Sequence, residues 1–287
     1  MTTAYDTPAV LAVAPNGARR GKVDHAALPL TPAELAQAAA DAVAAGASMI
    51  HLHVRDADGR HSLDADLYRA AIAAVEDATG DRLLIQVTSE AAGVYDAPAQ
   101  IAAMRALKPG FCSLGLKEFL PEGAGRAAET DLYRLLDDLA AAGGRWQWIL
   151  YDAHEVERLA RLRDRGILPV AGGLDGGAAP VLYVLGRYAP GGGRPGDLVG
   201  FLAARAETGF EDPWMVCAFG PAELAATGAA LSLGGHARLG FENNMTLRDG
   251  APAPDNAALI GQAAGVAAAL GRPVADAATA RALFGIG

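Results

Sequence analysis

Short runs of β-branched and apolar residues alternate with longer alanine- and leucine-rich segments from one end of the chain to the other. The short runs predict strands at residues 8–14, 48–54, 83–88, 111–116, 147–152, 180–186, 213–218 and 237–241. The longer segments predict helices from Thr31 to near Gly46 and at residues 64–79, 97–107, 130–142, 153–165, 196–207, 221–230 and 255–270. Strict alternation of eight strands with eight helices favours an α/β fold, the (β/α)8 barrel, over an open doubly wound sheet. No linker-like stretch divides the chain, so we expect a single barrel domain over residues 1–287.

Composition narrows the classes of function. Hydrophobic residues make up 52% of the 287 residues, which is ample for a sizeable core. The formal charge is -9 and no basic patch is visible, so we expect no nucleic-acid partner. No apolar stretch is long enough to span a membrane, and the first residues do not read as a signal peptide. Cys112 and Cys217 lie in apolar runs far apart, which is typical of buried free thiols in a reducing compartment. We therefore expect a cytoplasmic protein.

The second predicted strand contains two histidines, in Met49-Ile50-His51-Leu52-His53-Val54. Residues two apart in a strand project to the same side, so His51 and His53 point together into the barrel. Two imidazoles on one face near the end of a strand are a natural pair of metal ligands. The alternative is a pair of core histidines, whose four ring nitrogens would need partners among their neighbours.

A third ligand is expected from the end of another strand. Glu242 falls at the carboxyl end of the last predicted strand, on the same face as Arg238. Two histidines and one glutamate leave positions open for water or substrate, as a catalytic zinc site requires. The alternative is a salt bridge between Arg238 and Glu242, but four residues of extended strand separate the two side chains too widely for an easy contact.

Two long loops are expected at the carboxyl ends of strands, which is the face where barrels carry their active sites. One runs from Pro15 to Leu30 and the other from Gly186 to Gly196. The second loop is rich in glycine, including Gly192, and carries Arg187 and Arg194. It is interpreted either as a binding lip for the phosphate groups of a ligand or as a flexible surface loop.

Five segments together resemble the β-keto acid cleavage enzymes, and the resemblance covers nearly the whole chain. The segments are Ala14-Pro15-Asn16-Gly17-Ala18, Leu30-Thr31-Pro32, Gly46 through Asp56, Val184-Leu185-Gly186, and the Gly-Gly-His and Gly-Phe-Glu-Asn motifs at residues 234–243. This resemblance implies a TIM barrel that holds a divalent metal, usually Zn2+, through His51, His53 and Glu242. It also implies a retro-Claisen exchange of a β-keto acid with acetyl-CoA, which gives acetoacetate and a new acyl-CoA, and a homo-oligomer, a tetramer in many members.

The resemblance also assigns residues around the metal. The hydroxyl positions near the metal match Thr88 and Ser113, although either could simply be a polar residue that ends a strand. Arg238 matches an arginine suited to holding a carboxylate or the general base. Asn16 and Ser89, which lie in the loops beside these positions, are included with Arg187 and Gly192 among the expected substrate contacts.

Two positions depart from the better-known members of the family. Those members carry an aspartate as general base directly after the metal glutamate, whereas this chain has Asn243, which cannot take up a proton at neutral pH. Glu90, just past the third predicted strand, is our candidate for the base, with a solvated loop acid as the alternative. Arg19 replaces an acid that suits an amine-bearing substrate, so it predicts an anionic or neutral distal end on the keto acid.

Two other functions stay open at this point. One is a metal-dependent hydrolase of the amidohydrolase type, which would use further ligands such as Asp152 and Asp175. The other is a barrel that binds metal or ligand without turnover. In that case Asn243, in place of the aspartate base, would indicate that catalytic activity has been lost. The remaining histidines are predicted on the surface or in loops (His25, His61 and His154) or behind the metal ligands (His236).

Overall fold

The structure, a computed structural model, describes residues 7–168 and 179–286. Eight parallel strands close into a barrel in the order β1-β10-β9-β8-β7-β6-β5-β2. Their bounds are β1 Leu11–Val13, β2 Met49–Leu52, β5 Leu84–Thr88, β6 Phe111–Gly115, β7 Arg145–Leu150, β8 Val181–Leu185, β9 Trp214–Ala218 and β10 His236–Leu239. Each corresponds to one predicted strand, so the predicted (β/α)8 barrel is confirmed. That the barrel is the single domain of residues 1–287 stays a prediction.

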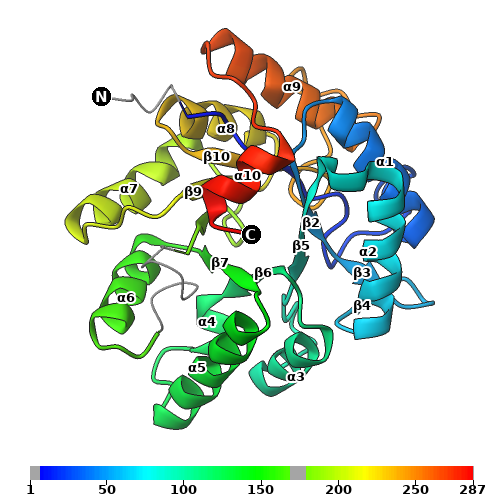
Figure 1. Ribbon diagram of the computed structural model, residues 1–287. Helices are drawn as coiled ribbons and strands as arrows, with labels where there is room; N and C mark the ends of the chain where they lie inside the picture. The colour runs from blue at the N-terminus through cyan, green and yellow to red at the C-terminus, as the bar shows by residue number, and fades with distance from the viewer. Residues whose placement is uncertain (1–6, 169–178, 287) are drawn as a thin grey trace.

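A ring of helices surrounds the strands (Figure 1). Their bounds are α1 Pro32–Ala44, α2 Ala65–Thr79, α3 Ala97–Leu107, α5 Arg126–Ala141, α6 Ala153–Asp164, α7 Leu198–Glu207, α8 Glu223–Ser232 and α9 Asn256–Ala269. Several begin at residues that satisfy the free amide groups of a helix start. At α1, for example, the Thr31 side chain accepts a hydrogen bond from the Glu34 amide, and the Glu34 carboxylate accepts one from the Thr31 amide.

The alternation of side chains along each strand divides the core into two layers. On β2, Ile50 and Leu52 pack in the larger cluster between the strands and the helices. Met49 packs in a smaller cluster inside the barrel, with Leu84 and Phe111 of neighbouring strands. His51 therefore points inward with the same periodicity as Met49, and this periodicity places its imidazole in the barrel mouth.

A last helix, α10 (Ala277–Phe284), closes the amino-terminal end of the barrel and lies across its centre in Figure 1. Phe284 contacts the ring of Phe111, at the start of β6, and the ring of His236, at the start of β10. The Nδ1 atom of His236 accepts a hydrogen bond from the Val10 amide. The position predicted for His236 behind the metal ligands is therefore wrong, because this residue lies at the opposite end of its strand.

Two short elements at the carboxyl-terminal face were not predicted. Strands β3 (Val54–Arg55) and β4 (His61–Ser62) form an antiparallel hairpin directly after β2. A single helical turn, α4 (Leu116–Phe119), follows β6. Both elements bring side chains to the mouth of the barrel.

Cys112 and Cys217 are buried and free, as predicted. Among the helices that the structure describes, none is both long and apolar enough to cross a membrane.

Candidate metal centre and catalytic pocket

Three predicted metal ligands meet at the carboxyl-terminal mouth of the barrel. The Nε2 atoms of His51 and His53 lie 3.1 Å apart. The Oε2 atom of Glu242 lies 3.7 Å from Nε2 of His51 and 3.5 Å from Nε2 of His53. All three residues are buried. They form a group of side chains that could hold a metal ion, as predicted.

The geometry of this group fits a small divalent cation. In a tetrahedral site with bonds of about 2.0–2.2 Å, two ligand atoms are separated by roughly 3.4 Å. The separations of 3.1, 3.5 and 3.7 Å fall around that value. The Oε2 atom of Glu242 accepts no hydrogen bond from the described residues, and it is buried. A bound cation would satisfy this unpartnered carboxylate oxygen and the two imidazole nitrogens beside it.

Hydrogen bonds on the far side of the ligands fix their orientation. The Nδ1 atom of His51 lies 2.8 Å from the Oε1 atom of Gln86, and the side-chain amide of Gln86 donates to Oε1 of Gln147. Since Oε1 of Gln86 can only accept, Nδ1 of His51 carries the proton and Nε2 presents its lone pair to the centre. This relay was not predicted from the sequence, although Gln86 and Gln147 occupy inward-facing positions on β5 and β7.

Glu242 reaches the histidines because the chain turns at the end of β10. The strand ends at Leu239, Gly240 has a φ of 141°, and residues 241–243 form a turn. This turn brings the Glu242 carboxylate back over Arg238, whose Nη2 donates to Oε1 at 3.0 Å. The expectation that the two side chains are too far apart is therefore wrong, since an extended strand was assumed through a residue that breaks it.

Gly17 provides the space for that carboxylate. A Cβ atom at Gly17, which has a φ of +59°, would lie 2.6 Å from Cγ of Glu242. The loop after β1 is held against the turn by Arg20, which donates to the Phe241 carbonyl oxygen at 2.6 Å. The loop after β1 and the turn after β10 thus pack against each other at Glu242.

Burial and nearby charges keep His51 and Glu242 in the protonation states that can bind a metal. Burial, with the nearby charge of Arg238, holds the pKa of His51 well below its usual value. Burial alone would raise the pKa of Glu242, but the charge of Arg238 and the two histidines outweigh that effect and hold it well below the usual value. A neutral imidazole and an ionised carboxylate are the forms that bind a metal.

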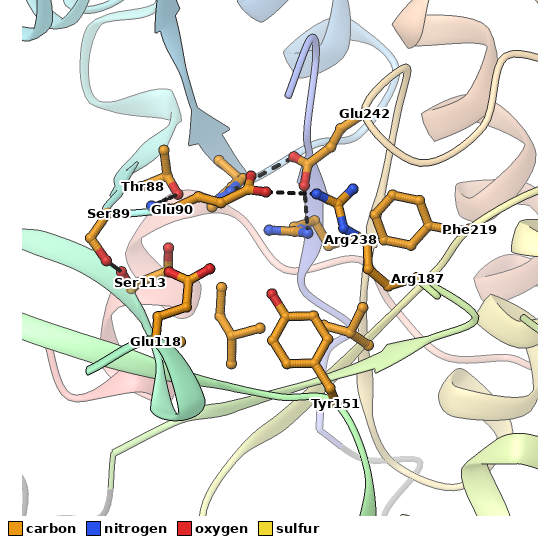
Figure 2. A pocket seen from close by; sticks show the side chains of 14 residues that line it. Thr88, Ser89, Glu90, Ser113, Glu118, Tyr151, Arg187, Phe219, Arg238 and Glu242 are labelled. Atoms are coloured by element: carbon orange, nitrogen blue, oxygen red, sulfur yellow. Dashed lines mark hydrogen bonds and ion pairs between the residues drawn. The ribbon is translucent and has the colours of Figure 1, made fainter. Parts of the chain in front are cut away.

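A pocket opens beside these ligands (Figure 2). It is lined mainly by polar and aromatic residues from the ends of seven barrel strands and the segments that follow them: His51, Thr88, Ser89, Glu90, Ser113, Gly115, Glu118, Ile149, Tyr151, Val184, Arg187, Phe219, Arg238 and Glu242. The predicted residues Thr88, Ser89, Glu90, Ser113, Arg187 and Arg238 are therefore gathered at one place.

Three hydroxyl groups face the pocket at the ends of β5 and β6. The Thr88 hydroxyl accepts a hydrogen bond from the Glu90 amide, and the Ser89 hydroxyl donates to the Ser113 carbonyl oxygen. The Ser113 hydroxyl is buried and has no hydrogen-bond partner in the described part of the chain. Among the described residues, the Thr88 hydroxyl therefore keeps its donor free, and the Ser113 hydroxyl keeps both its donor and its acceptor sites free for a bound molecule.

Glu90 lies between a cation and the metal ligands. Its Oε1 atom accepts a hydrogen bond from Nη2 of Arg187 at 2.6 Å, and its Oε2 atom lies 3.9 Å from Nε2 of His53. The Arg187 guanidinium lies over the ring of Phe219, 4.7 Å from its centroid. Only 13% of the Glu90 side chain is exposed, so it is not a solvated loop acid.

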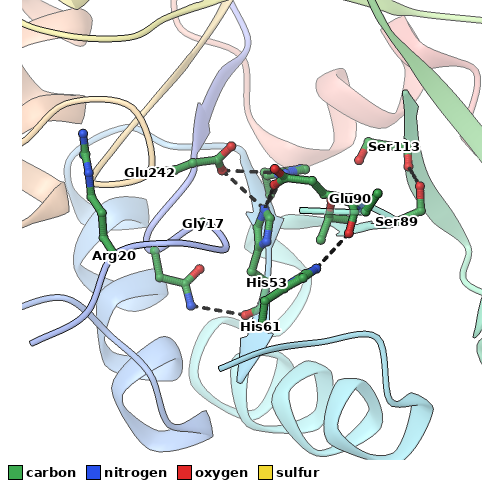
Figure 3. Close-up of polar contacts among 12 residues, drawn as sticks. Gly17, Arg20, His53, His61, Ser89, Glu90, Ser113 and Glu242 are labelled. Carbon is green, nitrogen blue, oxygen red and sulfur yellow. Dashed lines mark hydrogen bonds and ion pairs between the residues drawn. The ribbon is translucent and has the colours of Figure 1, made fainter. Parts of the chain in front are cut away.

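His61, on the hairpin strand β4, lies beside Glu90 and His53 (Figure 3). Its Nε2 atom is 2.8 Å from the carbonyl oxygen of Glu90, and its ring centroid is 5.4 Å from that of His53. The prediction of a surface or loop position for His61 is wrong, because only 7% of the residue is exposed. A hairpin of two-residue strands gives no periodic signal by which the sequence could have shown this.

Four of the residues predicted as catalytic or as substrate contacts do not line the pocket. Arg19 is exposed and forms no ion pair with any described residue. Asn16 lies behind the metal ligands, where its side-chain amide donates to the His53 carbonyl oxygen at 3.3 Å. Gly192 packs against the backbone of Phe219, since a Cβ atom there would lie 2.1 Å from the Phe219 carbonyl oxygen. The buried side chain of Asn243 has no hydrogen-bond partner among the residues described.

The acids considered as further hydrolase ligands do not join this centre. The Asp152 carboxylate caps α6, where it accepts a hydrogen bond from the Glu155 amide at 2.8 Å. Asp175 lies outside the described residues.

Comparison with known proteins identifies the family. The family described as beta-keto acid cleavage enzyme matches residues 8–286 of the chain. The chain belongs to the β-keto acid cleavage enzyme family. It is therefore an enzyme, and neither the hydrolase nor the barrel without turnover is supported.

Two relatives illustrate the range of the β-keto acid cleavage enzymes. The chain is 28% identical over 275 residues to a 3-keto-5-aminohexanoate cleavage enzyme of Acetoanaerobium sticklandii, a match that covers 94% of this chain and 95% of the relative. It is 30% identical over 287 residues to a 3-oxoadipate:acetyl-CoA acetyltransferase of Cupriavidus necator, over 97% and 95% of the two chains. Among solved structures, the binary complex of ObcA with oxaloacetate shares the fold, with a TM-score of 0.69, 19% identity and coverage of 91% of this chain and 67% of that one.

Proposed function

We propose that this enzyme cleaves a β-keto acid in exchange with acetyl-CoA, releasing acetoacetate and a new acyl-CoA. The proposal is carried by the position of the His51–His53–Glu242 group beside a pocket that is lined by hydroxyl and guanidinium groups. The name of the 3-oxoadipate:acetyl-CoA acetyltransferase supports both the co-substrate and the class of reaction.

His51, His53 and Glu242 would hold Zn2+ or a similar divalent cation. The donor set of two imidazoles and one carboxylate suits zinc, and it leaves a position free for substrate. A bound cation would supply Lewis-acid polarisation of the keto oxygen. The chain's own contribution is to orient the ligands, through Gln86 on His51 and Arg238 on Glu242.

The pocket residues next to the ligands would bind the β-keto carboxylate. Ser113 offers an unpartnered hydroxyl, and Thr88 and Ser89 present further oxygens beside it. Two atoms of the buried Arg238 guanidinium, Nε and Nη1, have no partner among the described residues. A carboxylate bound between these groups would take hydrogen bonds that the protein leaves unmade.

Glu90 is the proposed general base. Its carboxylate lies beside the ligand His53 and is held by Arg187, which orients it toward the space where substrate carbon would lie. Asn243 cannot take this role, because its side chain has no proton-accepting group of suitable pKa. Asn243 is part of the turn that carries Glu242, and its buried side-chain amide has no hydrogen-bond partner among the described residues.

The decisive experiment offers a panel of β-keto acids to metal-replete enzyme, with and without acetyl-CoA. We expect acetoacetate and a new thioester only when acetyl-CoA is present. The His53→Ala variant, which lacks one ligand, should bind less zinc and form no thioester, while the exposed His154→Ala variant should behave as wild type. Cleavage of the keto acid without acetyl-CoA would overturn the proposal.

We also infer a cytoplasmic homo-oligomer, a tetramer by family resemblance. Two buried, free cysteines suit a reducing compartment. Light scattering coupled to size-exclusion chromatography tests the oligomer, and a molar mass near that of the 29.3 kDa chain would contradict it.

A further inference from the structure

The wall of the pocket has a polar side and an apolar side. At the ends of the neighbouring strands β5 and β6 it presents the hydroxyl groups of Thr88 and Ser113. The next three strands of the barrel, β7, β8 and β9, contribute Ile149, Val184 and, directly after β9, Phe219. Ile149 and Val184 belong to the inner core cluster, and Phe219 packs against it. An anionic molecule and a neutral, mostly apolar one can therefore lie side by side in this pocket.

Tyr151 adds a hydroxyl group to the apolar side. It follows the last residue of β7, two positions after Ile149, so its side chain points into the mouth of the barrel. Its ring packs against the inner core cluster, and Figure 2 shows its hydroxyl directed into the pocket. Within residues 7–168 and 179–286 this hydroxyl forms no hydrogen bond.

Two other tyrosines near the site show the contrast. The Tyr68 hydroxyl donates to the Thr88 carbonyl oxygen at 3.0 Å, and the Tyr95 hydroxyl donates to the His61 carbonyl oxygen at 3.5 Å. Both hydroxyls thus support the backbone of the site. The Tyr151 hydroxyl supports no described residue in this way, so its donor is available to a bound molecule.

Contacts on the ring and on the backbone hold Tyr151 in place. The Nζ atom of Lys117 lies 3.6 Å from the centroid of the Tyr151 ring, and the ring of Tyr188 lies 5.6 Å away, centroid to centroid. The Tyr151 amide donates to Oε2 of Glu155 at 2.6 Å. The hydroxyl is therefore oriented before a substrate binds, which is the condition for stabilising a developing charge without rearrangement of the protein.

Tyr151 keeps its proton at neutral pH. Burial, together with the negative charges of Glu118 and Glu90, raises the pKa of Tyr151 well above its usual value. The hydroxyl is therefore a neutral hydrogen-bond donor. Such a donor suits an oxygen that becomes negative only during the reaction.

The proposed reaction places negative charge on the thioester oxygen as well as on the keto acid. Carbon 2 of the keto acid, after losing a proton to Glu90, forms a bond to the carbonyl carbon of the thioester, and the π-electron pair of that carbonyl moves onto its oxygen. The pair returns when the carbon–sulfur bond breaks and the CoA thiolate leaves. The metal ligands would face the keto oxygen, and Ser113 and Arg238 the carboxylate, so the thioester oxygen needs a donor of its own.

We infer that the Tyr151 hydroxyl is a catalytic hydrogen-bond donor, which binds the carbonyl oxygen of the acetyl thioester and stabilises the charge that this oxygen acquires. The inference rests on the proposed function. The acetyl thioester is neutral and apolar apart from this oxygen, so it fits the apolar side of the pocket. Of the two described side chains with donors on that side, Arg187 is paired with Glu90 at 2.6 Å and Tyr151 is free.

The test separates loss of the proton from attack on the thioester. Acetoacetate serves as the keto acid, because it is the product of the proposed reaction with any native substrate. Entry of deuterium from D2O at carbon 2 of acetoacetate, corrected for the rate without enzyme, reports the first step. Transfer of carbon-13 from the acetyl group of acetyl-CoA into acetoacetate reports the second. If the wild type transfers no label, the keto acid that it converts fastest replaces acetoacetate, and the new thioester replaces the label.

The variant Tyr151→Phe removes only the hydroxyl, which has no partner among the described residues to lose, so melting temperature and zinc content should match the wild type. Label transfer should fall roughly 10²–10³-fold, mainly through kcat, as is typical for loss of one oxyanion donor, whereas deuterium entry should change less than about threefold. The control Tyr133→Phe removes the hydroxyl of a tyrosine that is 43% exposed on α5, and it should change neither rate.

Three results would overturn the inference. Label transfer in Tyr151→Phe at nearly the wild-type rate would show that the hydroxyl is not needed, and an equal fall in both rates would place it on the keto acid. A loss of zinc or a lower melting temperature would assign it to the structure.

Two results in the wild type bear on the proposed function instead. Absence of deuterium entry would count against Glu90 as the base, and label transfer alone would then decide on Tyr151. If the wild type forms no labelled acetoacetate and no thioester from any keto acid, the proposed function is removed.

Discussion

Arg238 donates a hydrogen bond from Nη2 to one oxygen of Glu242, and the other oxygen of that carboxylate faces the two imidazoles. The arginine is buried and lies on β10, whereas the glutamate lies on the turn that follows. One guanidinium thus sets which oxygen is available as a ligand, and it keeps the carboxylate ionised through its charge.

Replacing this arginine should weaken metal binding. Arg238→Met removes the group that orients the ligand, and loss of such a partner typically costs ten- to a hundredfold in metal affinity. Competition with a chelator of known zinc affinity measures the change. The exposed Arg248→Met variant is the control. Unchanged zinc affinity in Arg238→Met would show that the turn alone positions Glu242.

Replacing the proposed base should lower turnover and leave the metal in place. Glu90→Gln keeps the size of the side chain but cannot take up a proton, and loss of a general base typically reduces kcat by roughly 10²–10⁴-fold. Steady-state kinetics and zinc content are measured on the same sample. Near-normal kcat with a full complement of zinc would remove Glu90 as the base.

Placing an acid at residue 243 tests the departure from the family pattern. Since Glu90 is assigned as the base, Asn243→Asp should not increase kcat. It introduces a charge into a fully buried position, so we expect a lower melting temperature as well. Activity that appears only in Asn243→Asp would show that the wild-type barrel lacks its base.

Replacing His61 should disturb Glu90 without removing the metal. His61→Phe fills a similar volume but cannot donate to the Glu90 carbonyl oxygen, and one such hydrogen bond contributes about 1 kcal/mol. We expect kcat to fall roughly fivefold, with zinc content unchanged. The exposed His154→Phe variant serves as control. A loss of zinc in His61→Phe would instead identify His61 as a support of His53.

His236 should make stability depend on pH in the acid range. Burial, with the charge of Arg272, lowers the pKa of His236 to about 3, from 6.5 in the unfolded chain. The unfolded state therefore binds more protons as pH falls through this interval, and stability is lost on acidification. For this residue the loss between pH 6.5 and 5 is roughly 1.5–2 kcal/mol.

The variant His236→Asn isolates this effect. Asparagine can accept the Val10 amide hydrogen bond but does not titrate. The free energy of unfolding, measured in urea, should therefore decrease less between pH 6.5 and 5 in the variant than in the wild type. This holds even if the two proteins differ in stability at neutral pH. Parallel curves for the two proteins would contradict the assigned role of His236.

The barrel could be predicted from the sequence because its signals are periodic. Inward and outward positions alternate along β2, so the orientation of His51 follows from the same pattern as the burial of Ile50. The Glu242 ligand was predictable from its place at the end of the last strand. Its salt bridge with Arg238 was not, because the turn at Gly240 changes the geometry over two residues.

The lining of the pocket was less accessible to sequence reasoning. His61 reaches Glu90 through a hairpin of two-residue strands, and Glu118 reaches the pocket through one helical turn. Such short elements have too few residues for a period to be visible. Gln86 was in a predicted strand, but its contact with His51 depends on strand register, which the sequence does not specify.

The placement of β1 between β2 and β10 has a consequence for a chain emerging from the ribosome. His51 and His53 are synthesised well before Glu242, which joins them only after β10 and the turn that follows it have been made and the ring has closed. Any ion held by all three side chains is thus acquired by a finished barrel. A nascent fragment that ends before β10 offers only the two imidazoles. Two ligands bind a metal ion more weakly and less selectively than the complete set of three.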